Sequence, residues 1–207
     1  MKILIICGID RLGKDTQIEK IYNEYKDKYN ISIRHFGKPN PKDNESSLIY
    51  QFKSFDNEID YLNNISMMEK QFGYYNKENL IIYNRFYLGE LVYGTLYRNH
   101  TLFNILDNII KPLENRLLKF INFNNILTLL FYTDNVDIIM DDGKSLSNGD
   151  ISKIKSEQNL FKYSLQHTKF NYELIKVNDE NHFKSKDDIF DIIKNKINTF
   201  LIYDECC

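Results

Sequence analysis

A glycine-rich loop between an apolar strand and an amphipathic helix is the feature that most constrains the fold of this chain. Residues 8–14 read Gly-Ile-Asp-Arg-Leu-Gly-Lys, which is the spacing of a phosphate-binding loop. The β-prone run Ile3–Cys7 precedes the loop. Apolar residues follow it at helical spacing: Ile18, Ile21, Tyr22 and Tyr25. This context argues against a chance match and predicts a strand, a phosphate loop and a helix.

Each part of the loop has a role in holding a triphosphate. Gly8 and Gly13 let backbone N–H groups curl around an anion, the next helix points its positive end at it, and Lys14 adds a charge. The residue after the lysine is normally a Ser or Thr that binds Mg²⁺, but here it is Asp15, with Thr16 next. Both are candidate metal ligands. Alternatively, Asp15 faces solvent and stabilises the helix N-terminus.

Four further segments have the pattern of strands, with helical patterns between them: Ile31–Phe36, Leu80–Tyr83, Ile126–Tyr132 and Tyr172–Val177. Ser185 and Asp188 form a capping box ahead of the last helical pattern. The alternation predicts an α/β three-layer sandwich, in which helices cover both faces of a five-stranded parallel sheet. Because no repeat or Pro/Gly/Ser-rich linker divides the sequence, we expect a single domain over residues 1–207.

Charge and composition exclude several classes of function. The 27 Lys and Arg residues and 29 Asp and Glu residues give a net charge of -2, which does not suit a polyanion, so we expect no nucleic-acid partner. No apolar run approaches the roughly 18 residues of a membrane span. Three cysteines cannot form a paired disulfide framework. We therefore expect a cytoplasmic protein with no membrane partner.

A polar segment around residues 137–158 interrupts the rhythm of strands and helices. Small and charged residues crowd its middle: Asp141, Asp142, Gly143, Lys144, Ser145, Ser147, Asn148 and Gly149. Such a composition is typical of a mobile loop. We expect this segment to be a lid.

The phosphate loop and a second segment resemble the thymidylate kinase family of P-loop nucleoside monophosphate kinases. Residues 8–17, Gly-Ile-Asp-Arg-Leu-Gly-Lys-Asp-Thr-Gln, are similar to the family's Gly-Xaa-Asp-Arg/Gly-Xaa-Gly-Lys-Ser/Thr-Thr-Gln loop. Asn84-Arg85-Phe86, with Tyr93 further on, resembles its Asp-Arg-Tyr/His segment and the aromatic residue beyond. The resemblance spans most of the chain and implies a kinase that uses ATP and Mg²⁺ to phosphorylate a (deoxy)nucleoside monophosphate. It also implies a homodimer.

The resemblance assigns roles to individual residues. Those implied to bind ATP are Gly8, Asp10, Arg11, Leu12, Gly13, Lys14, Asp15 and Thr16. Those implied to bind the acceptor are Asp10, Phe36, Arg85 and Tyr93. Arg11, Lys14 and Arg85 would be the catalytic cations, with Arg85 holding the acceptor phosphate through its guanidinium fork. The alternative for Arg85 is a surface ion pair, and the segment Arg34–Pro39 either lines the acceptor site or is simply a turn.

The position of the catalytic arginine provides a consistency check. In the family this residue comes either from the phosphate loop or from the lid. The lid here contains Lys144, Lys153 and Lys155 but no arginine, whereas the loop contains Arg11. The sequence therefore favours the loop, the alternative being that Arg11 is a solvated loop residue.

Two parts of the sequence depart from the family's pattern. Asn84 replaces the acidic residue before the arginine, which leaves metal binding open, with Asp10 as a remaining acidic candidate. The helix before the third strand lacks the family's aromatic and arginine for thymine, because Asn63 and Met67 stand there, and we expect Met67 and Met68 to fill the core. The acceptor could therefore be another monophosphate or a nucleoside, or the chain could be a nucleotide-binding relative without catalysis.

Overall fold

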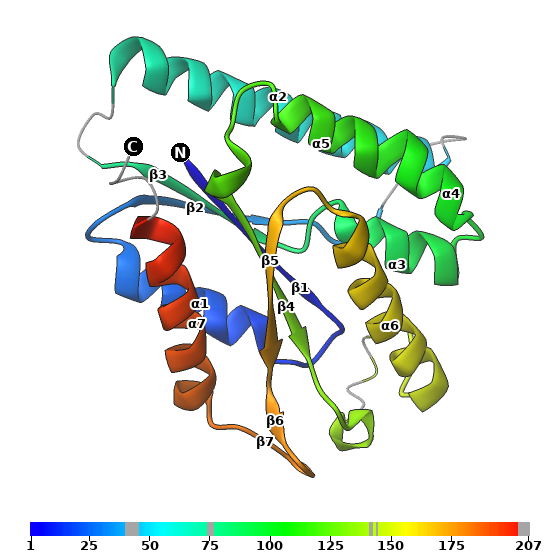
Figure 1. Cartoon of the computed structure of the whole chain (residues 1–207). Helices are drawn as coiled ribbons and strands as arrows, with labels where there is room; N and C mark the ends of the chain where they lie inside the picture. Colours follow the sequence, from blue (N-terminus) through cyan, green and yellow to red (C-terminus); the bar gives the residue numbers. More distant parts are fainter. Residues whose placement is uncertain (40–45, 74–76, 141–142, 144, 203–207) are drawn as a thin grey trace.

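The computed structural model describes residues 1–39, 46–73, 77–140, 143 and 145–202. Its centre is a parallel sheet with the strand order β2-β3-β1-β4-β5 (Figure 1). The strands are β1 (Lys2–Gly8), β2 (Asn30–His35), β3 (Asn79–Asn84), β4 (Ile126–Tyr132) and β5 (Asn171–Lys176). The five-stranded parallel sheet expected from the sequence is confirmed.

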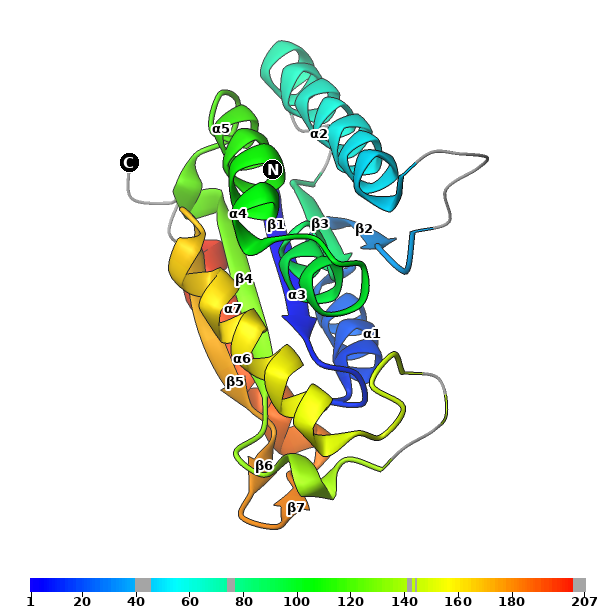
Figure 2. The ribbon, with the colours of Figure 1, turned by 90° about the vertical axis from the view of Figure 1, so that its right-hand side faces the viewer.

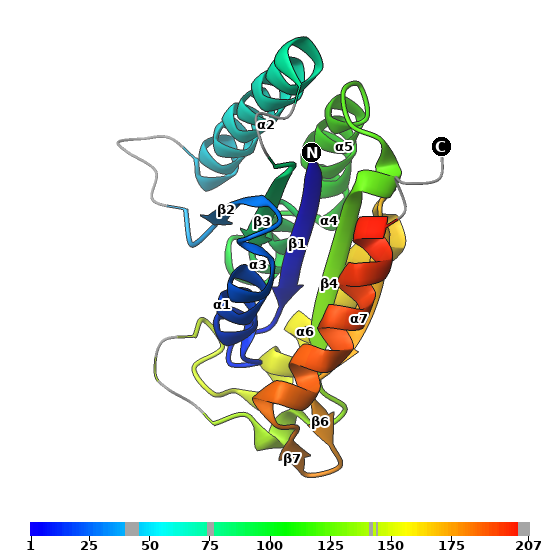
Figure 3. The ribbon, with the colours of Figure 1, turned by 90° about the vertical axis from the view of Figure 1, so that its left-hand side faces the viewer.

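Helices cover both faces of the sheet, as expected for a three-layer sandwich. Figure 3 shows α1 (Lys14–Tyr25) and α7 (Lys186–Ile202) on one face, and Figure 2 shows α3 (Leu88–Tyr97) and α6 (Ile151–His167) on the other. The long helix α2 (Ser47–Phe72) packs beside α5. The remaining elements are α4 (Leu102–Ile105), α5 (Lys111–Leu117), a π-helical stretch between them (Leu106–Ile110), 3₁₀ turns (Phe123–Asn125, Val136–Ile138) and a small hairpin, β6 (Asn178–Asp179) with β7 (His182–Phe183).

The burial of each strand follows its place in the sheet. Every residue of β1 is buried, and so is nearly all of β4, because helices cover both sides of the central strands. This is why their sequences are continuous apolar runs rather than alternating ones. The edge strands β2 and β5 are partly exposed. Within the described part of the chain, no helix is long and apolar enough to cross a membrane.

The carboxyl ends of β1, β2 and β3 meet at one edge of the sheet. Ile6 pairs with Asn84, and Asn84 pairs with His35 on the other side. The phosphate loop leaves β1 two residues after Ile6, and Arg85 follows β3 directly. Parallel α/β sheets bind ligands at this edge. The register therefore brings the two motifs of the sequence together.

The N-terminus of α7 has the cap that the sequence predicted, whereas α6 begins inside the segment expected to be a lid. Ser185 Oγ accepts a hydrogen bond from the Asp188 backbone N at 3.0 Å, so α7 begins at the expected cap. Asp150 caps α6 by accepting from the backbone N of Ser152 and Lys153. The second part of the expected lid segment, residues 151–158, is therefore helix. Asp141, Asp142 and Lys144 lie outside the described residues, and a lid motion stays a prediction.

Candidate functional site

The phosphate loop is shaped by two glycines with positive φ. Gly8 (φ 132°) packs so closely against β4 that a Cβ there would lie 2.4 Å from the carbonyl oxygen of Phe131. Gly13 (φ 76°) is the N-cap of α1 and adopts the left-handed conformation that glycine tolerates best. Leu12 is buried in the core, which leaves its backbone as the part that can meet a ligand. The loop thus sits at the N-terminus of α1, where an anion is favoured.

Lys14 is buried in this loop and carries an unfavourable charge there. Only 6% of the residue is exposed, and its Nζ donates a hydrogen bond to the backbone oxygen of Ile9 at 2.5 Å. Burial, followed by the nearby charge of Arg85, lowers the pKa of Lys14 to about 8. A cation in such surroundings is stabilised by an incoming anion.

A cavity of about 300 Å³ opens in front of the loop. Its lining contains Asp10, Arg11, Gly13, Lys14, Asp15, Thr16, His35, Asn84 and Arg85. Most of the residues assigned to ATP from the sequence therefore share one cavity. Asp15 is exposed, as one interpretation of the sequence had it, but its carboxylate also accepts a hydrogen bond from Asn84 Nδ2.

Arg85 and Asp10 stand where this cavity meets a second one. Both line the two cavities, and they form an ion pair with each other. The Arg85 guanidinium lies 5.5 Å from the centre of the Tyr93 ring. Arg85 has a left-handed backbone (φ 62°), and its N–H donates to the Ile6 oxygen at 2.8 Å. Its side chain is 21% exposed and reaches the Asp10 carboxylate.

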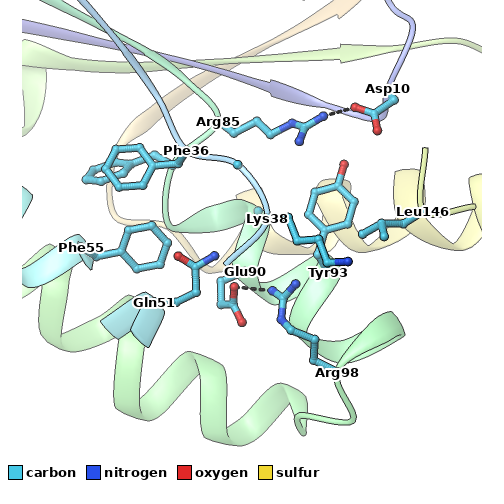
Figure 4. A pocket seen from close by; sticks show the side chains of 13 residues that line it. Asp10, Phe36, Lys38, Gln51, Phe55, Arg85, Glu90, Tyr93, Arg98 and Leu146 are labelled. Atoms are coloured by element: carbon cyan, nitrogen blue, oxygen red, sulfur yellow. Dashed lines mark hydrogen bonds and ion pairs between the residues drawn. The ribbon is translucent and has the colours of Figure 1, made fainter. Parts of the chain in front are cut away.

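The second cavity has a volume of about 150 Å³ and lies on the α3 side of Arg85 (Figure 4). Its lining contains Asp10, Phe36, Gly37, Lys38, Gln51, Phe55, Arg85, Phe86, Gly89, Glu90, Tyr93, Arg98 and Leu146. All four residues assigned to the acceptor from the sequence are among them. So are Gly37 and Lys38, from the segment that the sequence left open between acceptor site and turn.

The part of α2 that faces this cavity differs from the sequence interpretation. Gln51 and Phe55 line it, whereas Asn63 and Met67 lie two to four turns further along the helix, about 12–24 Å away from them by helical rise. Met67 and Met68 are 59% and 54% exposed, so the expectation that they fill the core was wrong. The absence of an aromatic at Asn63 therefore says nothing about the pocket, because Phe55 supplies an aromatic ring.

Several polar residues in or beside the cavities were not assigned a role from the sequence, among them Gln51 in the lining of the second cavity. Glu90 and Arg98 form an ion pair in the second cavity. Glu157 on α6 is 2% exposed and accepts a hydrogen bond from Tyr97 Oη at 2.5 Å. Burial raises the pKa of Glu157, and the charge of Asp10 raises it further. One sequence signal could have identified Glu90, since it is the only charged residue within α3.

Arg11 connects the phosphate loop to the polar segment. It also has a left-handed backbone (φ 67°). Its guanidinium donates to the Met140 backbone oxygen at 2.5 Å and to Ser145 Oγ. Lys153 and Lys155 are exposed on α6. Arg11 is thus the arginine that links the loop with the segment expected to be a lid.

No family model and no curated protein matches the sequence. Solved structures do match the fold. A thymidylate kinase from Ehrlichia chaffeensis is 13% identical, with a TM-score of 0.60 over 95% of this chain and 98% of that chain. The YorR protein from Bacillus subtilis, solved in complex with phosphorylated GDP, is 17% identical, with a TM-score of 0.57 over 95% and 96% of the two chains. The chain therefore has the P-loop kinase fold, at low identity to these structures.

Proposed function

We propose that the protein is an ATP-dependent nucleoside monophosphate kinase that transfers the γ-phosphoryl group of ATP to a (deoxy)nucleoside monophosphate. The observation that carries this proposal is the position of Arg85, which lines both the phosphate-loop cavity and the second cavity. An arginine at such a junction can hold the acceptor phosphate while its neighbour Lys14 holds the donor's. This position supports transfer because it would hold the acceptor phosphate next to the donor phosphates.

The charges at this junction suit phosphoryl transfer. The reaction requires little covalent work from the protein, so positioning and charge stabilisation dominate. Lys14 would bind the β- and γ-phosphates, and Arg85 would release Asp10 in part to hold the acceptor phosphate. Arg11, held at the other side of the loop, would stabilise charge that develops on the transferred group. The polar segment joined to Arg11 would exclude water from it.

The residues in front of the loop fit a magnesium ion that binds together with ATP. Mg²⁺ prefers oxygen ligands and is often held by one or two carboxylates plus substrate phosphates. Asp15 and Thr16 provide a carboxylate and a hydroxyl at the loop, and the Asn84 amide holds the Asp15 carboxylate in place. Among the described residues no group of three or more His, Cys, Asp or Glu side chains could hold a metal alone. When bound, Mg²⁺ would neutralise phosphate charge.

The structural matches support the same class of reaction. One is a thymidylate kinase, and the other was solved with a phosphorylated guanine nucleotide. Both names are compatible with a monophosphate in the second cavity. A kinase of a nucleoside is the main competing activity within the fold, and it would leave Arg85 without an acceptor phosphate to hold.

The test is an acceptor panel. The protein, ATP and Mg²⁺ are combined with each NMP, each dNMP and the corresponding nucleosides, and ADP formation is followed. We expect ADP formation that depends on a monophosphate and is abolished in Lys14→Ala, with the circular dichroism spectrum unchanged. ATP binding without acceptor-dependent turnover would rule out the kinase, and turnover of nucleosides alone would show the competing activity. Near-parental turnover in Lys14→Ala would show that the phosphate loop is misassigned.

A further inference from the structure

The second cavity has an apolar middle and a polar end far from Arg85 (Figure 4). The Phe36 ring lies 5.3 Å from that of Phe55 and 5.1 Å from that of Phe86, measured between ring centres. These rings form an apolar wall suited to a flat base. Beyond them the lining is polar: Gln51, Glu90 and Arg98. A base that lies along the wall, with its phosphate toward Arg85, would present its hydrogen-bonding edge to this polar end.

Glu90 is a buried carboxylate, and one of its two oxygens has no hydrogen-bond partner among the described residues. Its side chain has no exposed surface, and its Oε2 accepts a hydrogen bond from the Arg98 guanidinium. Its Oε1 is buried and has no partner among the described residues, and the same holds for Nε of Arg98. Buried polar atoms in native proteins are nearly always hydrogen-bonded. Both residues line the second cavity, so an unsatisfied acceptor on one and an unsatisfied donor on the other point to a ligand that supplies the complementary pair.

The space for the Glu90 carboxylate depends on a glycine of the same helix. A Cβ on Gly94, one turn along α3, would lie 2.7 Å from Glu90 Oε1 and 2.9 Å from Ile105 Cδ1. The glycine thus leaves space for the carboxylate. Burial raises the pKa of Glu90, and the hydrogen bond and charge of Arg98 offset only part of this shift. The ion pair with the Arg98 guanidinium is what favours the carboxylate form. An ionised carboxylate accepts hydrogen bonds and donates none.

We propose that Glu90 accepts a hydrogen bond from the exocyclic amino group of the acceptor's base, and that the preferred base is guanine. This inference rests on the proposed function, because it places the acceptor in the second cavity. Guanine has an amino group and a ring N–H side by side, next to the carbonyl oxygen O6. The two N–H groups complement the carboxylate of Glu90, and O6 complements the guanidinium of Arg98.

The other bases fit this pair less well. Thymine has no amino group, and its ring N–H lies between two carbonyl oxygens, so a carboxylate that approaches the N–H also meets a carbonyl oxygen. Cytosine and adenine have an amino group next to a ring nitrogen that accepts hydrogen bonds. They would satisfy Glu90 with a single group and leave no carbonyl beside it for Arg98. Guanine alone offers two adjacent donors and an acceptor in a row.

The experiment compares two ligands that differ only at the proposed contact. Hypoxanthine lacks the 2-amino group of guanine, so dGMP and dIMP isolate its contribution. Calorimetric titration of the full chain without ATP gives the two dissociation constants. We expect dIMP to bind about 10- to 100-fold more weakly than dGMP, the range for one hydrogen bond to a charged group. We expect dTMP to bind at least about 10-fold more weakly than dGMP.

Variants then locate the contact. Glu90→Gln keeps the shape of the side chain, and we expect it to bring the dGMP and dIMP affinities within about threefold of each other. Glu69→Gln is the matched control: Glu69 lies near the far end of α2, pairs with the Met1 amino group, and should leave the ratio unchanged. Equal affinities of the unaltered protein for dGMP and dIMP would overturn the proposal without any variant. So would tightest binding of dTMP, dCMP or dAMP.

Binding and turnover separate this inference from the proposed function. If dGMP binds with the expected preference but no acceptor supports ADP formation, the kinase fails and the role of Glu90 stands. If ADP forms fastest with dTMP and dTMP binds most tightly, the kinase stands and the role of Glu90 fails.

Discussion

Arg11 and Arg85 hold left-handed backbone conformations, which cost a non-glycine residue on the order of 1–3 kcal/mol. Both are fixed by hydrogen bonds, Arg85 through its backbone N–H to Ile6 and Arg11 through its side chain to Met140 and Ser145. Such strain persists only where the surroundings enforce it. The Arg85 guanidinium reaches Asp10 at the junction of the two cavities, and the Arg11 guanidinium reaches the polar segment.

Arg11 is expected to act on the transition state rather than on ATP binding. Arginines that meet the transferred phosphoryl group contribute about 10³–10⁵ to kcat, so Arg11→Ala should lower kcat by roughly a thousandfold. The dissociation constant for ATP should barely change, because Lys14 and the loop backbone remain. Steady-state kinetics with an ATP titration measures both.

Lysine variants of the polar segment serve as the control for Arg11. Lys153→Ala and Lys155→Ala remove exposed cations from α6, and each should cost little activity. Lys144→Ala, at a position outside the described residues, is expected to behave in the same way. An essential lysine together with a dispensable Arg11 would contradict the assignment.

The charge state of Lys14 predicts a pH dependence. Its pKa of about 8 in the ligand-free protein means that it loses its proton, and with it the attraction for phosphate, as the pH rises through 8. Because kcat/KM reports ionisations of the free enzyme, kcat/KM for ATP should fall above about pH 8. Lys14→Arg, whose side chain stays charged, should lack this break. A flat profile in the unaltered protein up to pH 9.5 would contradict the prediction.

The contact between Asp15 and Asn84 can be tested by moving the carboxylate from position 15 to position 84. In the thymidylate kinase pattern that the sequence resembles, an acidic residue stands before the arginine and a hydroxyl follows the lysine. Here Asn84 and Asp15 stand at these two positions, and their side chains are hydrogen-bonded to each other. Asp15→Ser should weaken Mn²⁺ binding in the presence of an ATP analogue by about 10- to 100-fold. The double variant Asp15→Ser/Asn84→Asp should recover much of it. Paramagnetic resonance of Mn²⁺ gives the affinities, and failure of the double variant to recover would argue against a shared metal site.

At the scale of elements, the strands could be predicted and the orientation of α2 could not. Buried parallel strands need continuous apolar runs, and Ile126–Tyr132 has one, so its bounds follow from composition. Helix α2 has apolar residues on several sides, and 16 large hydrophobic residues of the described chain are exposed. Only the docking of Phe55 against Phe36 and Phe86 decides which turn faces the cavity.

The candidate site was likewise only partly readable from the sequence. The phosphate loop and Arg85 carry local patterns that show their chemistry. The pair of Glu90 and Arg98 is eight residues apart and has no such pattern, because its contact depends on how α3 ends. A lone acidic residue in an otherwise apolar helix is the one signal that points to it.

The cap of α7 gives a prediction about stability alone. Ser185→Ala removes the hydroxyl that accepts from Asp188 N, and an N-cap of this kind contributes about 1 kcal/mol. For a domain of this size the expected fall in Tm is about 2–4 °C. ADP formation should be unaffected, since α7 lies away from both cavities. Ser156→Ala is the control, because its hydroxyl only donates back to the Ser152 oxygen within α6, and it should change Tm by less than about 1–2 °C.

For the molecule as a whole, the register of β1 with β2 and β3 is what assembles the site. Segments from residues 8–16, 35–38 and 84–98 reach one edge of the sheet, and the described part of the polar segment joins them through Arg11 and Leu146. Occupation of either cavity would therefore brace three parts of the chain at once. The homodimer and the cytoplasmic location implied by the sequence stay predictions.

A ligand that spans both cavities should stabilise the protein more than either nucleotide alone. Adenosine and a deoxynucleoside joined by five phosphates would reach the phosphate loop and Arg85 together. With all ligands at the same saturating concentration, each tenfold of tighter binding by the joined ligand adds about 1.4 kcal/mol, or roughly 3–6 °C in Tm. A thermal melt with the joined ligand, ATP and the monophosphate in parallel tests this. No excess over the separate nucleotides would argue against adjoining donor and acceptor sites.

The close approach of Gly8 to the Phe131 carbonyl affects what conservation of this glycine in related sequences would mean. A side chain at this position would push two central strands apart, so selection for a foldable chain retains the glycine whether or not phosphate is ever bound. Lys14 is the opposite case, because its buried charge lowers the stability of the ligand-free protein. A lineage that stopped using nucleotides would shed the lysine early and keep the glycine. In descendants of this chain, loss of the lysine would therefore mark lost chemistry, and persistence of the glycine would mark only the fold.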